Sequence, residues 1–218
     1  MDKKNREIIL ISGLVLLIII TVSGVTYSFF NATVTGGSEN LRGQSYVFDV
    51  DVNLDPIRSG GLIPTDDDLI TASVNSNSKC LDKRGYALCS MYELTLTNNG
   101  AAQTLNGYLQ TDDSTTYTTN HLKYRLYQLS GSTYSLVSDT LSIAYTGNAK
   151  NYFKLNNSNI NFSLSDGSTR SQSTSYYLVI WLSDIDDNQL EDENQQFVWN
   201  IVFDSVSGNT VSSQFLTI

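Results

Sequence analysis

A run of acidic and amide side chains near the end of the chain has the residue types and spacing to bind a hard cation. Four of them stand at the first, third, fifth and ninth positions of a loop that resembles an EF-hand: Asp184, Asp186, Asn188 and Asp192. Gln189 replaces the glycine that such a loop needs, and Gln195 replaces its bidentate glutamate. Residues 66–68 form a second acidic cluster. Calcium is therefore one candidate ligand of these residues. The alternative, which is more common, is that the acidic loops are solvated and bind no ion.

The chain contains a single histidine, His121, which restricts the catalytic chemistry available to it. A zinc peptidase of the His-Glu-x-x-His type needs two histidines one turn apart on a helix, whereas His121 stands at the start of an expected strand. A Ser-His-Asp hydrolase would also depend on His121, and the sequence has no Gly-x-Ser-x-Gly segment to present the serine. We therefore expect a protein that is not an enzyme and carries no resident cofactor.

Cys80 and Cys89 are the only two cysteines, and they stand nine positions apart. Gly85 lies between them and can form the tight turn that brings the two ends of this segment together. A redox pair would have the closer Cys-x-x-Cys spacing, and two cysteines alone do not make a zinc cluster. The sequence predicts a structural disulfide, with two free thiols as the alternative. Because disulfides persist in oxidising compartments, this prediction goes together with the export that the start of the chain indicates.

The composition favours a folded, acidic domain. Hydrophobic residues make up 40% of the 218 residues, which is enough for a buried core and argues against disorder of the whole chain. The 22 acidic and 13 basic side chains give a formal net charge of −9. Binding to nucleic acid needs a basic surface, so we exclude nucleic acid as a partner.

The start of the chain has the pattern of an export segment. A short basic stretch precedes residues 8–25, which contain no charged side chain. This run is long for the apolar centre of a signal peptide and short for a membrane-spanning helix, so both interpretations stay open. Thr26 and Ser28 suit the −3 and −1 positions of a signal peptidase site, which places cleavage between Ser28 and Phe29. We expect residues 29–218 to be secreted after cleavage, or anchored at the cell surface without it.

Alternation of apolar and polar residues predicts about eight to ten short strands and no helix beyond the leader. The clearest segments are residues 46–54, 92–96, 122–126, 176–182 and 197–203. Residues 55–78 contain both prolines and are interpreted as a long irregular connection. We therefore expect a leader over residues 1–28 and one all-β domain, an antiparallel β-sandwich, over residues 29–218.

Two of these segments should supply much of the core. Residues 176–182 form a nearly continuous apolar run that is typical of a central strand, and residues 197–203 show the cleanest alternation in the chain. We expect five large side chains to be buried on neighbouring or facing strands: Trp181, Phe197, Trp199, Ile201 and Phe203.

Two segments carry motifs of a known group of exported proteins. Residues 24–31 read Gly-Val-Thr-Tyr-Ser-Phe-Phe-Asn, and residues 181–203 combine a strand, an acidic and amide-rich loop and a last amphipathic strand. Both resemble the TasA/camelysin family of biofilm-fibre proteins, whose export signals are cleaved by a SipW-type signal peptidase. Three positions depart from the family pattern: Ser28 replaces alanine, Ala32 replaces an acidic residue, and Val198 replaces glycine. The resemblance implies a jelly-roll-like sandwich that assembles into extracellular matrix fibres.

The resemblance predicts a secreted, non-enzymatic structural subunit whose partners are copies of itself or other matrix proteins. The expected assembly segment follows the cleavage site: Phe29, Phe30, Asn31, Ala32, Thr33, Val34 and Thr35. This segment is aromatic and β-branched and precedes Gly36 and Gly37, so it could leave its own domain and pair as a donor strand with a neighbour. It could equally form the first strand of its own sandwich.

The alternative function belongs to a different class. An uncleaved helix over residues 8–25 would be the chain's one contact with the membrane and would tether a surface binding or adhesion module. Loops rich in tyrosine would then provide the contact surface: Tyr117, Tyr124, Tyr127, Tyr134 and Tyr145. Sequence alone does not name the ligand of such a module.

Overall fold

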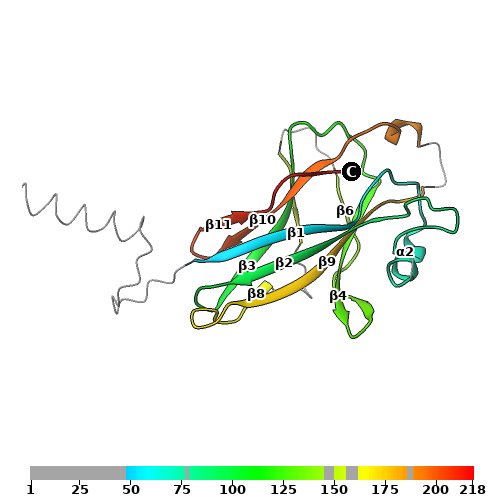
Figure 1. The fold of residues 1–218 in the computed structure, drawn as a ribbon. Helices are drawn as coiled ribbons and strands as arrows, with labels where there is room; N and C mark the ends of the chain where they lie inside the picture. The colour runs from blue at the N-terminus through cyan, green and yellow to red at the C-terminus, as the bar shows by residue number, and fades with distance from the viewer. Residues whose placement is uncertain (1–47, 77–78, 145–149, 156–161, 186–188) are drawn as a thin grey trace, which may run out of the picture. The chain divides into compact units, whose positions relative to one another are not determined.

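The computed structural model describes residues 48–76, 79–144, 150–155, 162–185 and 189–218, and Figure 1 shows their fold. The leader, the expected cleavage site between Ser28 and Phe29, and the expected assembly segment 29–35 lie outside the described residues. Within the part of the chain that is described, no helix is long and apolar enough to span a membrane.

The first sheet pairs segments that lie far apart in the chain. Five antiparallel strands follow one another in the order β1 (Val50–Arg58), β2 (Ser90–Asn98), β9 (Gln172–Leu182), β4 (Leu122–Ser130) and β5 (Thr133–Leu136). The short strand β6 (Leu141–Ser142) also pairs with β4. The ladder between β2 and β9 runs from Ser90 opposite Ile180 to Asn98 opposite Gln172. In this order β9 is the central strand, with β2 and β4 on either side of it.

The second sheet packs against the first, so the chain folds as a sandwich. Its order is β11 (Thr210–Ser212), β10 (Val198–Ser205), β3 (Gln103–Thr111) and β7 (Tyr152–Lys154). Two short strands complete it: β12 (Leu216–Thr217) pairs with β10, and β8 (Phe162–Leu164) pairs with β3. All pairs are antiparallel, and consecutive strands such as β2 and β3 lie in different sheets. The predicted all-β antiparallel sandwich is confirmed.

The inward side chains of the two sheets form the main core. Trp199 on β10 is completely buried and packs edge-on against Tyr92 of β2, with ring centroids 5.0 Å apart. Phe162 contacts Phe203 in its own sheet and Tyr176 in the first sheet. Such edge-to-face contacts add to the free energy gained by burying the rings. The prediction that residues 197–203 alternate into the core is confirmed.

A glycine makes room for these rings. A Cβ atom at Gly107 on β3 would lie 2.6 Å from the ring of Phe203 and 2.8 Å from the ring of Phe162. Real Cβ contacts are not that short, so a larger residue would force the aromatic rings apart. In residues 105–109 a glycine therefore stands at an inward position between Leu105 and Leu109, which weakens the apolar alternation of this strand in the sequence.

A second hydrophobic cluster covers the outer face of the first sheet. It is formed by α2 (Asp67–Val74), the disulfide and outward side chains of β2, β4 and β9: Ile70, Val74, Cys80, Cys89, Met91, Tyr127, Tyr177, Val179 and Trp181. Trp181 is buried as predicted, but in this outer cluster rather than in the sandwich core. The reason is that β9 is covered on both faces, and its residues are therefore apolar at successive positions.

The helix α2 corrects the prediction that residues 55–78 are irregular. β1 extends to Arg58, and the helix occupies Asp67–Val74. Asp66 is the N-cap, and its carboxylate accepts a hydrogen bond from the backbone N–H of Asp68 at 3.0 Å. A helix of eight residues gives too short an apolar period to stand out among glycines, aspartates and prolines, and its stability depends on packing against the sheet.

Cys80 and Cys89 form the predicted disulfide. Their Cα atoms lie 5.0 Å apart, and both residues are completely buried in the outer cluster. Gly85 has a φ of 90°, a left-handed conformation that glycine adopts without steric cost, and it forms the turn between the two cysteines. The Asp82 carboxylate accepts hydrogen bonds from the backbone N–H groups of Arg84 and Tyr86, both at 2.8 Å. The bridge joins the segment after α2 to the start of β2.

Candidate functional site

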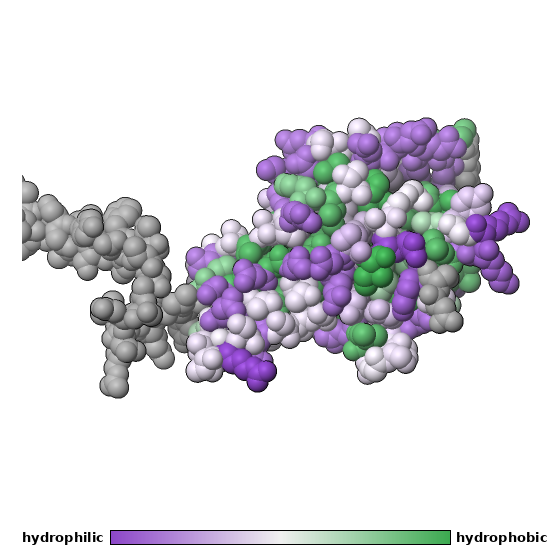
Figure 2. Space-filling model, in the orientation of Figure 1, coloured by the Kyte–Doolittle hydropathy of each residue, from purple (hydrophilic) through white to green (hydrophobic). Residues whose placement is uncertain are grey.

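The outer edge of β1 is the first candidate site. β1 is the end strand of its sheet, hydrogen-bonded to β2 and to no other strand of the described part. Val50 and Leu54 point into the core, while Asp51 and Asp55 are exposed. Figure 2 shows the surface over β1 and β2 as mainly hydrophilic or pale. The edge thus offers main-chain hydrogen-bonding groups beside carboxylates.

The start of this edge is fixed by the turn between β2 and β3. The Asn99 side chain donates to Asp51 at 3.1 Å, and its backbone N–H donates to the Asp49 carbonyl at 2.8 Å. Buried Asn98 donates to three carbonyl oxygens, among them that of Ser165 at 2.7 Å. The turn that follows Asn98 therefore positions the beginning of β1.

The second candidate site is a cavity of about 730 Å³ at the end of the sandwich where β9 ends and β4 begins. Its floor is apolar and receives side chains from β4 and β9 of the first sheet, from the residues that flank β10 and β12, and from two connections: Leu62, Tyr117, Leu122, Leu182, Phe197 and Ile218. Its rim carries carboxylates and amides: Asp184, Gln189, Asp192, Glu193, Asn194 and Gln195. A pocket of this size with an apolar floor and a few polar groups is typical of a small-molecule site.

Tyr117 closes the floor of this cavity as a neutral group. Its hydroxyl accepts a hydrogen bond from the backbone N–H of Leu122 at 2.7 Å, and burial raises the pKa of Tyr117 to about 12. Tyr117, Tyr124 and Tyr127 are all at least 96% buried, because each is at most 4% exposed. These three side chains therefore cannot form the tyrosine-rich contact surface that the sequence suggested, and Tyr145 lies outside the described residues.

The sole histidine of the chain meets Asp192 beside the cavity. Asp192 ends the 3-10 turn η1 (Leu190–Asp192), and its carboxylate accepts hydrogen bonds from His121 Nδ1 at 2.7 Å and Thr119 at 2.5 Å. Gln189 donates to the same carboxylate at 3.2 Å and to the Ser183 carbonyl at 3.0 Å. The Asp192 side chain is only 3% exposed. These contacts satisfy a buried carboxylate and hold η1 against the loop before β4.

The four residues of the calcium-like spacing are distributed as follows. Asp186 and Asn188 lie outside the described residues, Asp184 is on the cavity rim, and both carboxylate oxygens of Asp192 already accept hydrogen bonds. The described residues contain no group of three or more acidic, histidine or cysteine side chains that could hold a metal ion. The Asp192 carboxylate, at the ninth position of the calcium-like spacing, therefore stabilises this loop through its hydrogen bonds to Thr119 and His121.

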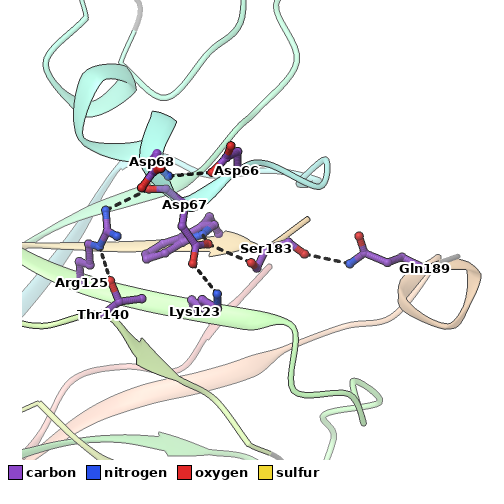
Figure 3. Close-up of polar contacts among 9 residues, drawn as sticks. Asp66, Asp67, Asp68, Lys123, Arg125, Thr140, Ser183 and Gln189 are labelled. Carbon is purple, nitrogen blue, oxygen red and sulfur yellow. Dashed lines mark hydrogen bonds and ion pairs between the residues drawn. The ribbon is translucent and has the colours of Figure 1, made fainter. Parts of the chain in front are cut away.

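The acidic cluster at residues 66–68 has a structural role that sequence reasoning missed. Asp67 accepts hydrogen bonds from Trp181 Nε1 at 2.8 Å and Ser183 Oγ at 2.9 Å, and it forms an ion pair with Lys123 (Figure 3). Burial alone would raise the pKa of the Asp67 carboxyl. The hydrogen bonds from Lys123, Trp181 and Ser183 outweigh that effect and hold the pKa below its ordinary value. Asp67 therefore joins the first turn of α2 to the ends of β9 and β4.

Arg125 on β4 reinforces this junction. Its guanidinium donates to the Asp67 carbonyl at 3.2 Å and to the Thr140 hydroxyl at 2.7 Å (Figure 3). It also lies over the Trp181 ring, 5.0 Å from the ring centroid. The helix and the outer face of the sheet are thus held together by polar contacts as well as by apolar packing.

No family model and no curated protein matches the chain. Among solved structures, the crystal structure of Spo0M, a sporulation control protein from Bacillus subtilis, is similar with 9% sequence identity and a TM-score of 0.32. The match covers 78% of this chain and 48% of that protein, so the chain spans about half the length of Spo0M. A TM-score this low supports no inference about fold or function.

Proposed function

We propose that the protein is a secreted, non-enzymatic structural subunit of an extracellular fibre or matrix. The disulfide between Cys80 and Cys89 supports an oxidising compartment, as in an exported protein. The two segments that resemble the TasA/camelysin family support a role in a biofilm matrix. The observation that carries the proposal is the outer edge of β1, which pairs with no other strand among the described residues and can accept one.

Donor-strand pairing at this edge is the proposed mode of assembly. If the β1 edges of two copies paired directly, Asp51 and Asp55 would approach the same carboxylates of the other copy, which disfavours that contact. The segment 29–35 contains no charged residue and is rich in aromatic and β-branched side chains. Charge therefore favours pairing of β1 with segment 29–35 of a neighbour over pairing of β1 with β1.

The test compares two proteins, residues 29–218 and residues 36–218, by electron microscopy and analytical ultracentrifugation. We expect fibres from the first protein and folded monomers from the second, because only the first has the donor segment. The monomers should bind an added peptide of residues 29–35. Equal fibre formation by both proteins would contradict donor-strand pairing.

A pair of point variants distinguishes strand pairing from non-specific hydrophobic association of segment 29–35. Successive residues of a strand point to opposite faces, so Val34 and Thr33 would face opposite sides of the extended sheet. Val34→Lys should weaken assembly because it places an ammonium group against the core, whereas Thr33→Lys should be tolerated at the surface. If both variants assemble equally well, the segment does not pair as a strand.

The cavity favours one alternative function, a surface module that binds a ligand and remains tethered by residues 8–25. Its volume of about 730 Å³ lies within the range of ligand-binding pockets. N-terminal sequencing of the exported protein separates the two functions. A mature chain that begins at Phe29 fits a released subunit, and an intact Met1 fits a tethered module.

A further inference from the structure

The charge distribution around the end cavity restricts what it can bind. Three carboxylates line it, those of Asp184, Asp192 and Glu193, and no lysine or arginine of the described residues does. The described residues contain only two ion pairs, His121 with Asp192 and Lys123 with Asp67, so Glu193 has no ion-pair partner among them. The rim therefore repels anions and attracts cations.

The apolar floor of the cavity favours a ligand with an apolar part. Leu122, Leu182 and Phe197 are buried beneath the cavity, and Leu190 adds an exposed apolar side chain at its rim. The neutral Tyr117 adds an aromatic wall without a charge. A ligand that fits both features has an aromatic or branched aliphatic body and a positive group at one end.

We propose that the end cavity binds a small amphiphilic organic cation. The apolar body lies against Leu122, Leu182 and Phe197, and the ammonium group lies at the rim beside Glu193 and Asp184. A peptide with a basic residue would need main-chain partners as well, whereas a small cation needs only the carboxylates and amides that the rim residues carry. This site is independent of the β1 edge, so it holds whether or not the protein forms fibres.

The test is a titration of the full-length chain with three probes of nearly equal size: 2-phenylethylammonium, 2-phenylethanol and 3-phenylpropanoate. Two-dimensional NMR measures affinity and locates the site through shifts of the cavity residues. We expect the cation to bind about five- to tenfold more tightly than the neutral alcohol, the size of effect that one or two partly exposed ion pairs produce. The anion should bind more weakly than both, and added salt should reduce the preference for the cation.

Two matched variants test the role of the rim. Glu193→Gln should reduce affinity for the cation about two- to fivefold and leave affinity for the alcohol unchanged, because only the charge is lost. Glu191→Gln, two positions away and outside this cavity, should leave both affinities unchanged. Equal binding of all three probes, equal effects of the two variants, or no saturable binding would overturn the proposal. Binding of acetyl-Phe-Lys-amide without binding of the free amine would overturn it in favour of a peptide ligand.

Discussion

Reduction of the Cys80–Cys89 disulfide should destabilise the domain by an amount that follows from its loop. The two cysteines are nine positions apart. Closing a loop of this length lowers the entropy of the unfolded chain enough to stabilise the folded state by about 2.6 kcal/mol at 25 °C. Domains of this kind have free energies of unfolding of about 5–15 kcal/mol, so reduction should remove a substantial fraction.

The assay is equilibrium unfolding in urea, with and without a reductant present throughout. Because both cysteines are completely buried, the reductant reaches them only when the chain opens, and each sample must be equilibrated for that reason. Trp199 reports on the sandwich core and Trp181 on the outer cluster, so their fluorescence can be followed separately in Trp181→Phe and Trp199→Phe variants. Coincident transitions would show that the two clusters unfold together.

The double variant Cys80→Ala, Cys89→Ala is the control. It should lose the same contribution of about 2.6 kcal/mol, together with about 1 kcal/mol for each buried sulfur removed, and it should not respond to the reductant. A change of less than about 1 kcal/mol on reduction of the unmodified protein would refute the loop-closure reasoning. It would mean that the reduced, unfolded chain still holds this segment closed.

Two further predictions concern the outer cluster and the core. Asp67→Asn should lower the free energy of unfolding by about 1–3 kcal/mol at pH 7, because the asparagine keeps one acceptor oxygen for Trp181 and Ser183 but places an NH₂ group, which cannot accept, opposite Lys123. The folded-state pKa of Asp67 is lowered, so its stabilisation is present above its ordinary value of 3.8 and is lost as the pH falls through the lower folded pKa. Urea unfolding should therefore show a constant difference between the two proteins from pH 5 to 7 and a smaller one below about pH 4; a difference that does not change with pH would contradict this. Trp199→Ala and Trp181→Ala should each cost about 3–5 kcal/mol in thermal or urea unfolding, and an unchanged stability for either would contradict its placement in a packed cluster.

The strand pattern could be predicted because alternation is a local property. A strand with one buried face repeats every two residues whatever its partners are, so Trp199, Ile201 and Phe203 were placed correctly from their spacing alone. The same reasoning predicted correctly that Trp181 is buried, but it did not place Trp181 in the outer cluster. A continuous apolar run shows that both faces of a strand are buried, but it does not show that a short helix and a disulfide loop cover the second face.

The polar contacts of the candidate site could not be predicted. His121 and Asp192 are 71 positions apart, and Asp67 and Trp181 are 114 positions apart. Considered alone, His121, Asp192 and Asp67 would each be interpreted as ordinary surface residues, and nothing in the sequence assigns Trp181 a polar partner. Only the strand order, which places the end of β9 beside the start of β4, brings these side chains together. A single sequence contains no local signal for that order.

The two edges of the first sheet differ in a way that would favour one of them in the proposed assembly. At the β5 edge, the side chain of Asn75, which caps the end of α2, donates to the Tyr134 carbonyl at 3.0 Å and accepts from the Tyr134 N–H at 2.8 Å. Lys79 also lies 4.0 Å from the centroid of the Tyr134 ring. These contacts occupy the main-chain groups that an incoming strand would need, and β5 has only four residues. β1 has nine residues and no such contacts along its outer edge among the described residues, so in the proposed assembly a donor strand would gain more hydrogen bonds at β1 than at β5.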